Sequence, residues 1–193
     1  MIKKILPLIL LFSLILGYGC SPAGVIASGG ATTMVVAEGN RSLGTVVDDA
    51  TIKLNLSSKF LQSDNNLFLN INTNVLDGRV LLTGIVDTQE IRIEAVRNVW
   101  EIDGVQEVIN EIQVGDKTTI KEYANDLWIN TQAKSLAAKT IGLRALNYNF
   151  ETIRGKVYIA GITIRQEQLN AILNSTKTIK GVKEIVNYVI VKE

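Results

Sequence analysis

The sequence contains no histidine, and Cys20 is its single cysteine. Without histidine the chain lacks the commonest general base and the commonest metal ligand, and it cannot form a Ser-His or Cys-His pair. One cysteine excludes an intrachain disulfide framework. We also find no metal-ligand cluster, nucleophile–base pair or phosphate-binding loop, so we expect no enzyme activity, no bound metal and no cofactor.

The chain also has almost no net charge, but its formal value of +1 hides a division. Residues 48–116 carry 12 acidic and 5 basic side chains, whereas residues 117–193 carry 6 acidic and 12 basic ones. The net charges are therefore −7 and +6. Such asymmetry informs about partners rather than fold. No aromatic-basic strand pattern accompanies the basic half, so we expect no nucleic acid as a partner.

The N-terminus has the pattern of an export signal. Lys3 and Lys4 precede an apolar run over residues 5–16, which is too short to span a bilayer. A lone cysteine after a small residue resembles a bacterial lipobox. The resemblance implies a lipoprotein signal peptide at residues 1–19, cleavage before Cys20 and a diacylglycerol on its thiol; Ser21 implies sorting to the outer membrane. The alternative is an ordinary secreted protein with an odd cysteine. Residues 20–47, rich in Gly, Ala, Ser and Thr, are then a lipidated flexible tether.

One stretch of eight residues occurs twice. Residues 78–85 read GRVLLTGI and residues 155–162 read GKVYIAGI, a constant offset of 77 that also pairs Asp49 with Asp126. We therefore predict two small domains, an acidic one at residues 48–116 and a basic one at residues 117–193.

Each copy shows the same order of periodicities. In the first, Asp48 and Asp49 are good residues for a helix start, followed by an apolar stripe that includes Ile52. A strand over residues 67–73, a hairpin at Asp77-Gly78, a strand over 80–82, a helix over 88–101 and a strand over 105–114 follow. In the second, we expect helices from Asp126 and Arg165 and strands at 146–150, 157–162 and 182–191. The predicted fold is α+β: two tandem αββαβ domains, each a three-stranded sheet with two helices on one face.

These repeats resemble the BON domain, the bacterial osmotic-shock and nodulation family. The resemblance is carried by a glycine-flanked strand and a later Gly-Val motif. In the first copy the matching residues are Gly78, Val80, Leu82, Gly84, Gly104, Val105, Val108 and Asn110. In the second they are Gly155, Val157, Ile159, Gly161, Gly181, Val182, Ile185 and Asn187. We assign these glycines to backbone geometry, not to a site.

The layout of a lipobox and two such domains is similar to that of the dual-BON outer-membrane lipoproteins of Gram-negative bacteria. This resemblance implies a protein on the periplasmic face of the outer membrane that binds anionic phospholipid, for example phosphatidylglycerol. It also implies support of envelope integrity and of the outer-membrane assembly machinery. The alternative hypothesis is a protein-interaction adaptor for an envelope complex.

The repeats differ most in their first helix, where Trp128 replaces Thr51 of the first copy. Trp128 lies about 100° from the core residue Ile129, so we expect it at the surface. A tryptophan beside cationic and polar groups suits a membrane interface. The predicted phospholipid-binding residues are Leu127, Trp128, Thr131, Gln132, Lys134, Ser135 and Lys139.

Packing between the two domains remains the alternative for Trp128, because their opposite charges favour docking. We expect Trp100 in a core or interface, and Tyr148, Phe150 and Tyr158 in packing.

Overall fold

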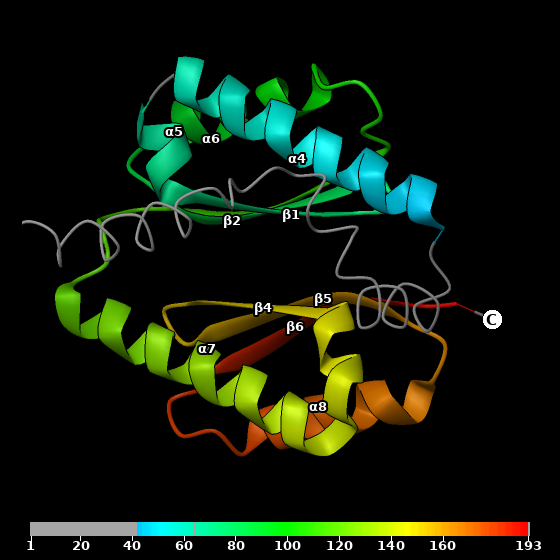
Figure 1. The fold of residues 1–193 in the computed structure, drawn as a ribbon. Helices are drawn as coiled ribbons and strands as arrows, with labels where there is room; N and C mark the ends of the chain where they lie inside the picture. Colours follow the sequence, from blue (N-terminus) through cyan, green and yellow to red (C-terminus); the bar gives the residue numbers. More distant parts are fainter. Residues whose placement is uncertain (1–41, 64, 193) are drawn as a thin grey trace, which may run out of the picture. The chain divides into compact units, whose positions relative to one another are not determined.

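The computed structural model describes residues 42–63 and 65–192, which all belong to one compact unit. The predicted signal peptide, Cys20 and most of the predicted tether lie outside the described residues. Figure 1 shows the elements of two α+β modules in chain order. The first module comprises α4 (Leu43–Ser63), α5 (Asn65–Asn70), β1 (Ile71–Leu76), β2 (Arg79–Val86), α6 (Gln89–Trp100) and β3 (Glu107–Val114). The second comprises α7 (Ile120–Ile141), the 3-10 helix η2 (Gly142–Asn147), β4 (Tyr148–Ile153), β5 (Lys156–Thr163), α8 (Gln166–Lys177) and β6 (Glu184–Val191).

Each module has one mixed three-stranded sheet whose central strand is the second one. β1 pairs antiparallel with β2, and β2 pairs parallel with β3; β4, β5 and β6 repeat this order. The hairpin turns have two residues with positive φ, Asp77 (51°) and Gly78 (72°) in the first module. Such backbone angles match the right-handed twist of the flanking strands. The predicted hairpin at this position is confirmed.

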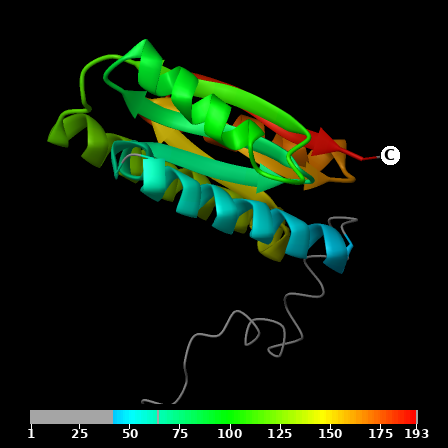
Figure 2. The same ribbon diagram turned by 90° about the horizontal axis from the view of Figure 1, so that it is seen from above.

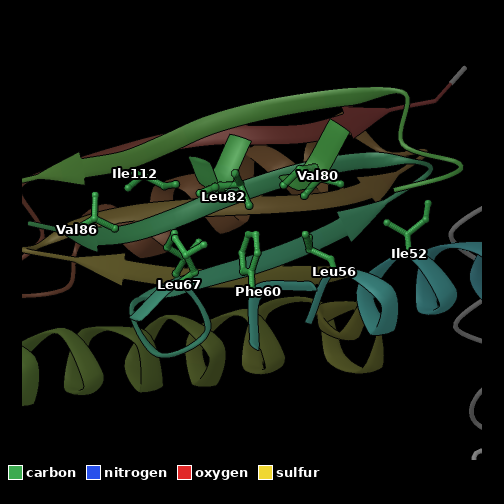
Figure 3. Close-up of a cluster of buried hydrophobic side chains, with 11 residues drawn as sticks. Ile52, Leu56, Phe60, Leu67, Val80, Leu82, Val86 and Ile112 are labelled. Carbon is green, nitrogen blue, oxygen red and sulfur yellow. The ribbon is translucent and has the colours of Figure 1, made fainter. Parts of the chain in front are cut away.

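In the first module both long helices pack on one face of the sheet, as Figures 1 and 2 show for α4 and α6. Ile52, Leu56 and Phe60, at intervals of four residues along α4, are at most 3% exposed. They face the strand residues Val80 and Leu82 (Figure 3). The predicted stripe and the predicted two-helix layer are confirmed.

Glycine is required at position 84 because two backbones approach closely there. A Cβ built on Gly84 would lie 2.1 Å from the carbonyl oxygen of Asn70, the last residue of α5. The equivalent Gly161 would place a Cβ 2.5 Å from the carbonyl oxygen of Asn147. Both positions therefore need glycine for packing, which is a role in backbone geometry, as expected for the glycines of the repeat.

Several elements differ from the prediction in their bounds or type. α4 begins at Leu43, not at Asp48, because Ser42 caps it with its hydroxyl 3.0 Å from the backbone nitrogen of Thr45. The segment predicted as a strand from residue 67 is helical up to Asn70. Leu67 and Leu69 do not share one face of a strand but lie on different sides of a short helix, where Leu67 is buried and Leu69 is 75% exposed. In the second module η2 occupies residues 142–147, so the strand predicted at 146–150 begins only at Tyr148.

The two sheets pack against each other through the faces that carry no helices. Leu81, Tyr158 and Ala160 are at most 6% exposed and form one apolar cluster. Partly buried residues pack around this cluster: Ile109, Ile153, Val186 and Tyr188. β2 and β5 are consequently buried on both faces, which explains their nearly continuous apolar runs.

Contacts across this interface join equivalent positions of the repeats. Tyr188 donates a hydrogen bond to Glu111, and these residues are 77 positions apart, the repeat offset. The contacts are also reciprocal. Lys192 pairs with Asp77 at 2.7 Å, and Arg154, the equivalent of Asp77, donates to the carbonyl oxygen of Asp116 at 2.5 Å, next to the equivalent of Lys192. Reciprocal contacts of this kind define a two-fold relation between the modules.

Candidate functional site

α7 begins six residues after the end of β3, at a complete capping box. Thr119 accepts a hydrogen bond from the backbone of Glu122 at 3.3 Å, and Glu122 accepts one from the backbone of Thr119 at 2.9 Å. These bonds satisfy two otherwise unpaired donors of the first turn. The hydrogen bonds from Thr119 also hold the pKa of Glu122 below its usual value. The helix therefore starts at Ile120, before the predicted start at Asp126.

The buried face of α7 fixes the rotation of the helix about its axis. Ile129, Ala133 and Ala137 are at most 1% exposed and pack on the second sheet. Asp126, 8% exposed, accepts hydrogen bonds from the backbone nitrogens of Arg154 at 2.6 Å and Gly155 at 2.8 Å. The carboxylate thus joins the helix to the β4–β5 turn and leaves the opposite face of α7 to the outside.

That opposite face carries apolar and basic residues. Leu127 and Trp128 are 55% and 46% exposed. Thr131, Ser135 and Lys139 are also exposed on this side of the helix. The two acids of α7 do not contribute, because Glu122 is held in the capping box and Asp126 is buried. The Thr131 hydroxyl donates to the carbonyl oxygen of Leu127 at 2.8 Å, so it can enter a less polar medium with its donor satisfied.

The remaining two predicted residues lie at the flanks of this face. Gln132 is only partly exposed, and it lies about 160° around the helix from Lys134, on the far side of Trp128. Lys134 is exposed and lines a cavity of about 320 Å³ together with Lys53 of α4. The structure therefore places five of the seven predicted residues on the outward face of α7, with Gln132 and Lys134 at its two edges.

The same cavity contains a partly buried carboxyl group. Glu151 of β4 accepts a hydrogen bond from the Asn72 amide at 3.1 Å and lines the cavity beside Lys134. Burial raises the pKa of Glu151, and the positive charge of Lys134 partly opposes this shift. Glu151 can therefore be neutralised more easily than an exposed glutamate as the pH falls.

Sequence reasoning missed the first turn of α7. Ile120 is 90% exposed and Tyr123 is 64% exposed. Ile120 and Leu127 are seven residues apart and therefore share one side of the helix. The sequence did contain a signal for this helix start: Thr119 followed three residues later by Glu122, the spacing of a capping box.

The aromatic residues outside α7 divide into two groups. Tyr148, Phe150 and Tyr158 are at most 5% exposed, which confirms their predicted packing role. Trp100 is 54% exposed in the last turn of α6, so of the two predicted places, a core or an interface, the core is wrong. Trp128 is not part of the apolar cluster between the sheets, which consists of strand residues.

Within the described ranges, 42–63 and 65–192, no cluster of three or more His, Cys, Asp or Glu side chains is arranged to hold a metal ion. In the same part of the chain, no helix combines the length and apolar character that crossing a membrane requires.

Comparison with known proteins identifies both modules. The model of the BON domain matches residues 48–116 and 125–193. A protein of Anaplasma centrale described as "Uncharacterized protein in gshII 5'region" is 39% identical over 76% of this chain and 96% of its own. The outer membrane lipoprotein DolP of Haemophilus influenzae is 30% identical over 92% of this chain and 91% of its own. A 21 kDa hemolysin of Actinobacillus pleuropneumoniae is 29% identical over 77% of this chain and 78% of its own.

Proposed function

Because the chain belongs to the BON family, with one BON domain in each repeat, we propose that it is an envelope protein that binds anionic phospholipid through the outward face of α7. The observation that carries this proposal is the exposed pair Leu127 and Trp128, with Lys139 three turns further along the outward face, on a helix whose two acids are engaged elsewhere. The similarity to DolP, which is described as an outer membrane lipoprotein, supports a place at the outer membrane. Attachment through a lipidated Cys20, on the periplasmic face, is part of the proposal.

The expected strength of the α7 contact explains why an anchor is useful. With 46% of its surface exposed, Trp128 can bury about 90 Å², or about 2 kcal/mol at 25 cal/mol/Å². Each well-placed lysine adds about 1 kcal/mol near an anionic surface. Such a sum gives binding in the millimolar range. A lipid anchor at the other end of the tether would supply a high effective concentration of bilayer, and α7 would supply orientation and lipid choice.

Vesicle co-sedimentation of the chain from Ser21 onward tests the proposal, because this fragment retains all the residues that the structure describes, 42–63 and 65–192. We expect binding to vesicles that contain phosphatidylglycerol, weaker binding at high salt and little binding to phosphatidylcholine. Trp128→Glu should lower the bound fraction strongly. Trp100→Glu is the matched control, since Trp100 is similarly exposed on α6, and it should bind as the unaltered fragment does.

An equal loss of vesicle binding in both variants would contradict the role of α7. Equal binding to phosphatidylglycerol and phosphatidylcholine vesicles would contradict it as well. Failure to bind either kind of vesicle would overturn the lipid proposal itself and favour the adaptor hypothesis.

A further inference from the structure

α4 has a line of exposed apolar residues that its own module does not use. Val47, Leu54 and Leu61 are 55%, 71% and 53% exposed. They are seven residues apart, so they follow one another along a single side of the helix. Single exposed apolar residues are common on protein surfaces, but a continuous stripe marks a contact surface.

The BON fold does not require this stripe. The equivalent residues of α7, at the offset of 77, are Ala124, Thr131 and Ala138. Both helices pack on their sheets through equivalent core positions, such as Ile52 and Ile129. Because α7 folds in the same way with small or polar residues on this side, the apolar stripe of α4 needs a reason outside its own module.

The two-fold relation places α4 and α7 on either side of one cavity. Lys53 and Ser57 of α4 and Lys134 of α7 line the same cavity of about 320 Å³. On α4, the equivalent of Leu127 is Ala50. Leu54 and Leu61 lie about 40° and 20° around the helix from Ala50. The stripe and Leu127 therefore occupy nearly the same side of two symmetry-related helices, with the cavity between them.

The polar groups around the stripe suit an anionic, partly dry surface. Thr51 and Ser57 donate their hydroxyl groups to the backbone of α4, at 2.9 Å and 2.8 Å, so both donors are already satisfied. Of the two acids in α4, Asp49 is buried, and Asp48 lies about 100° around the helix from Val47. Lys53 and Lys134 are both exposed at the cavity, and their two positive charges outnumber the one carboxyl group there, that of Glu151.

We infer that α4 is a second lipid-contacting helix: Val47, Leu54 and Leu61 enter the interface of an anionic bilayer beside α7, and Lys53 and Lys134 contact the headgroup phosphates between them. An amphipathic helix lying in the bilayer plane uses this combination of an apolar line and flanking lysines. The inference rests on the proposed function, and it turns a one-helix contact into a surface made by both domains.

The absence of other cysteines allows a direct test. Cys20 is the only cysteine, so the chain from Ser21 onward accepts one probe at a chosen site. We would introduce Leu54→Cys or Leu61→Cys, attach a polarity-sensitive fluorophore and add vesicles with phosphatidylglycerol or with phosphatidylcholine alone. Ile93→Cys on α6, whose native side chain is 50% exposed, is the matched control. We expect a blue shift and stronger emission at 54 and 61 with anionic vesicles, and no change at 93.

A second pair of variants measures the contribution of the stripe. Leu54→Glu should lower the partition coefficient for anionic vesicles about tenfold, because a charge replaces an inserted side chain, whereas Ile93→Glu should not. If the fragment binds vesicles in a Trp128-dependent manner but the probe at 54 does not respond, the inference about α4 is wrong and the role of α7 stands. If no vesicle binds, both fail. A response at 54 that persists in Trp128→Glu would support α4 and overturn the assignment of α7.

Discussion

Tyr188 and Glu111 occupy equivalent positions of the two repeats and are joined by a hydrogen bond across the sheet-to-sheet interface. Lys156 adds an ion pair to the same carboxylate at 3.3 Å. Two copies of the first module placed in this way would bring two carboxylates together, which repel. The divergence of this one position therefore favours pairing of the first module with the second.

Loss of the Tyr188 hydroxyl should destabilise the protein. Tyr188→Phe removes a hydrogen bond to a charged group, and we expect a loss of about 1–3 kcal/mol in the free energy of unfolding. Urea denaturation followed by circular dichroism measures it. Tyr123→Phe is the control, since Tyr123 is 64% exposed, and it should change stability by less than about 0.5 kcal/mol. Equal effects of the two substitutions would show that the bond to Glu111 contributes nothing.

The same hydrogen bond predicts how stability depends on alkaline pH. Burial, followed by the contact with Glu111, raises the pKa of Tyr188 above that of an ordinary tyrosine. A group whose pKa is raised by folding contributes stability that is present below its unfolded pKa, about 10, and is lost as the pH rises beyond it. We therefore expect the stability advantage over Tyr188→Phe to shrink above about pH 10. An absorbance titration of tyrosinate should show fewer late-titrating groups in the variant.

Asp49 and Asp126 should act as equivalent clamps between the first helix and the hairpin of each module. Asp49 accepts hydrogen bonds from the backbone nitrogens of Asp77 and Gly78, both at 2.9 Å, as Asp126 does in the second module. Replacement of Asp126 by alanine should cost about 2–4 kcal/mol, and by asparagine less, because one acceptor oxygen remains. Asp48→Ala changes the exposed neighbour of Asp49, and it should have a small effect on stability. Thermal unfolding of the three variants measures these effects. If Asp48→Ala lowers the midpoint as much as Asp126→Ala does, the loss reflects the helix start and not the clamp.

Glycine should be more strictly required at position 84 than at position 142. A Cβ at Gly84 would overlap the Asn70 carbonyl at 2.1 Å, so Gly84→Ala should cost more than about 3 kcal/mol or prevent folding. Gly142 has a φ of 64° and a ψ of −138°, which residues other than glycine rarely adopt, but no atom lies within 4 Å of its Cβ position. Gly142→Ala should therefore cost about 1–3 kcal/mol through backbone strain alone. Denaturation midpoints, or soluble yield where folding fails, separate the two, and a mild effect at 84 would refute the close approach.

Removal of the Glu151 charge should stabilise the protein at neutral pH. Burial raises the pKa of this carboxyl, so its contribution to stability is present below the unfolded pKa, about 4, and is lost as the pH rises through the folded value. Glu151→Gln keeps an acceptor for Asn72 and carries no charge. We expect it to be more stable than the unaltered protein near pH 7 and similar to it near pH 4. Glu167→Gln, on the exposed surface of α8, should show no such trend in the same urea series.

Local patterns predicted much of each module, and their failures have local causes. The core stripe of α4 and the turn at Asp77-Gly78 follow from neighbouring residues, so the sequence indicates them directly. The starts of α4 and α7 were missed because Ser42 and the Thr119–Glu122 pair lie in segments without an apolar stripe. The helical turn before β1 was mistaken for a strand, since a few alternating residues do not distinguish one helical turn from a strand.

The sequence by itself determined the duplication, the αββαβ order and the outward position of Trp128. Each of these depends on spacing along one chain, which the 77-residue offset and the helical period of 3.6 express directly. Only the tertiary structure decided that the two sheets pack face to face, and that Lys53 of α4 and Lys134 of α7 line one cavity. These relations join residues from different modules through side chains at a buried interface. No periodicity within either module specifies which face of its partner it will meet.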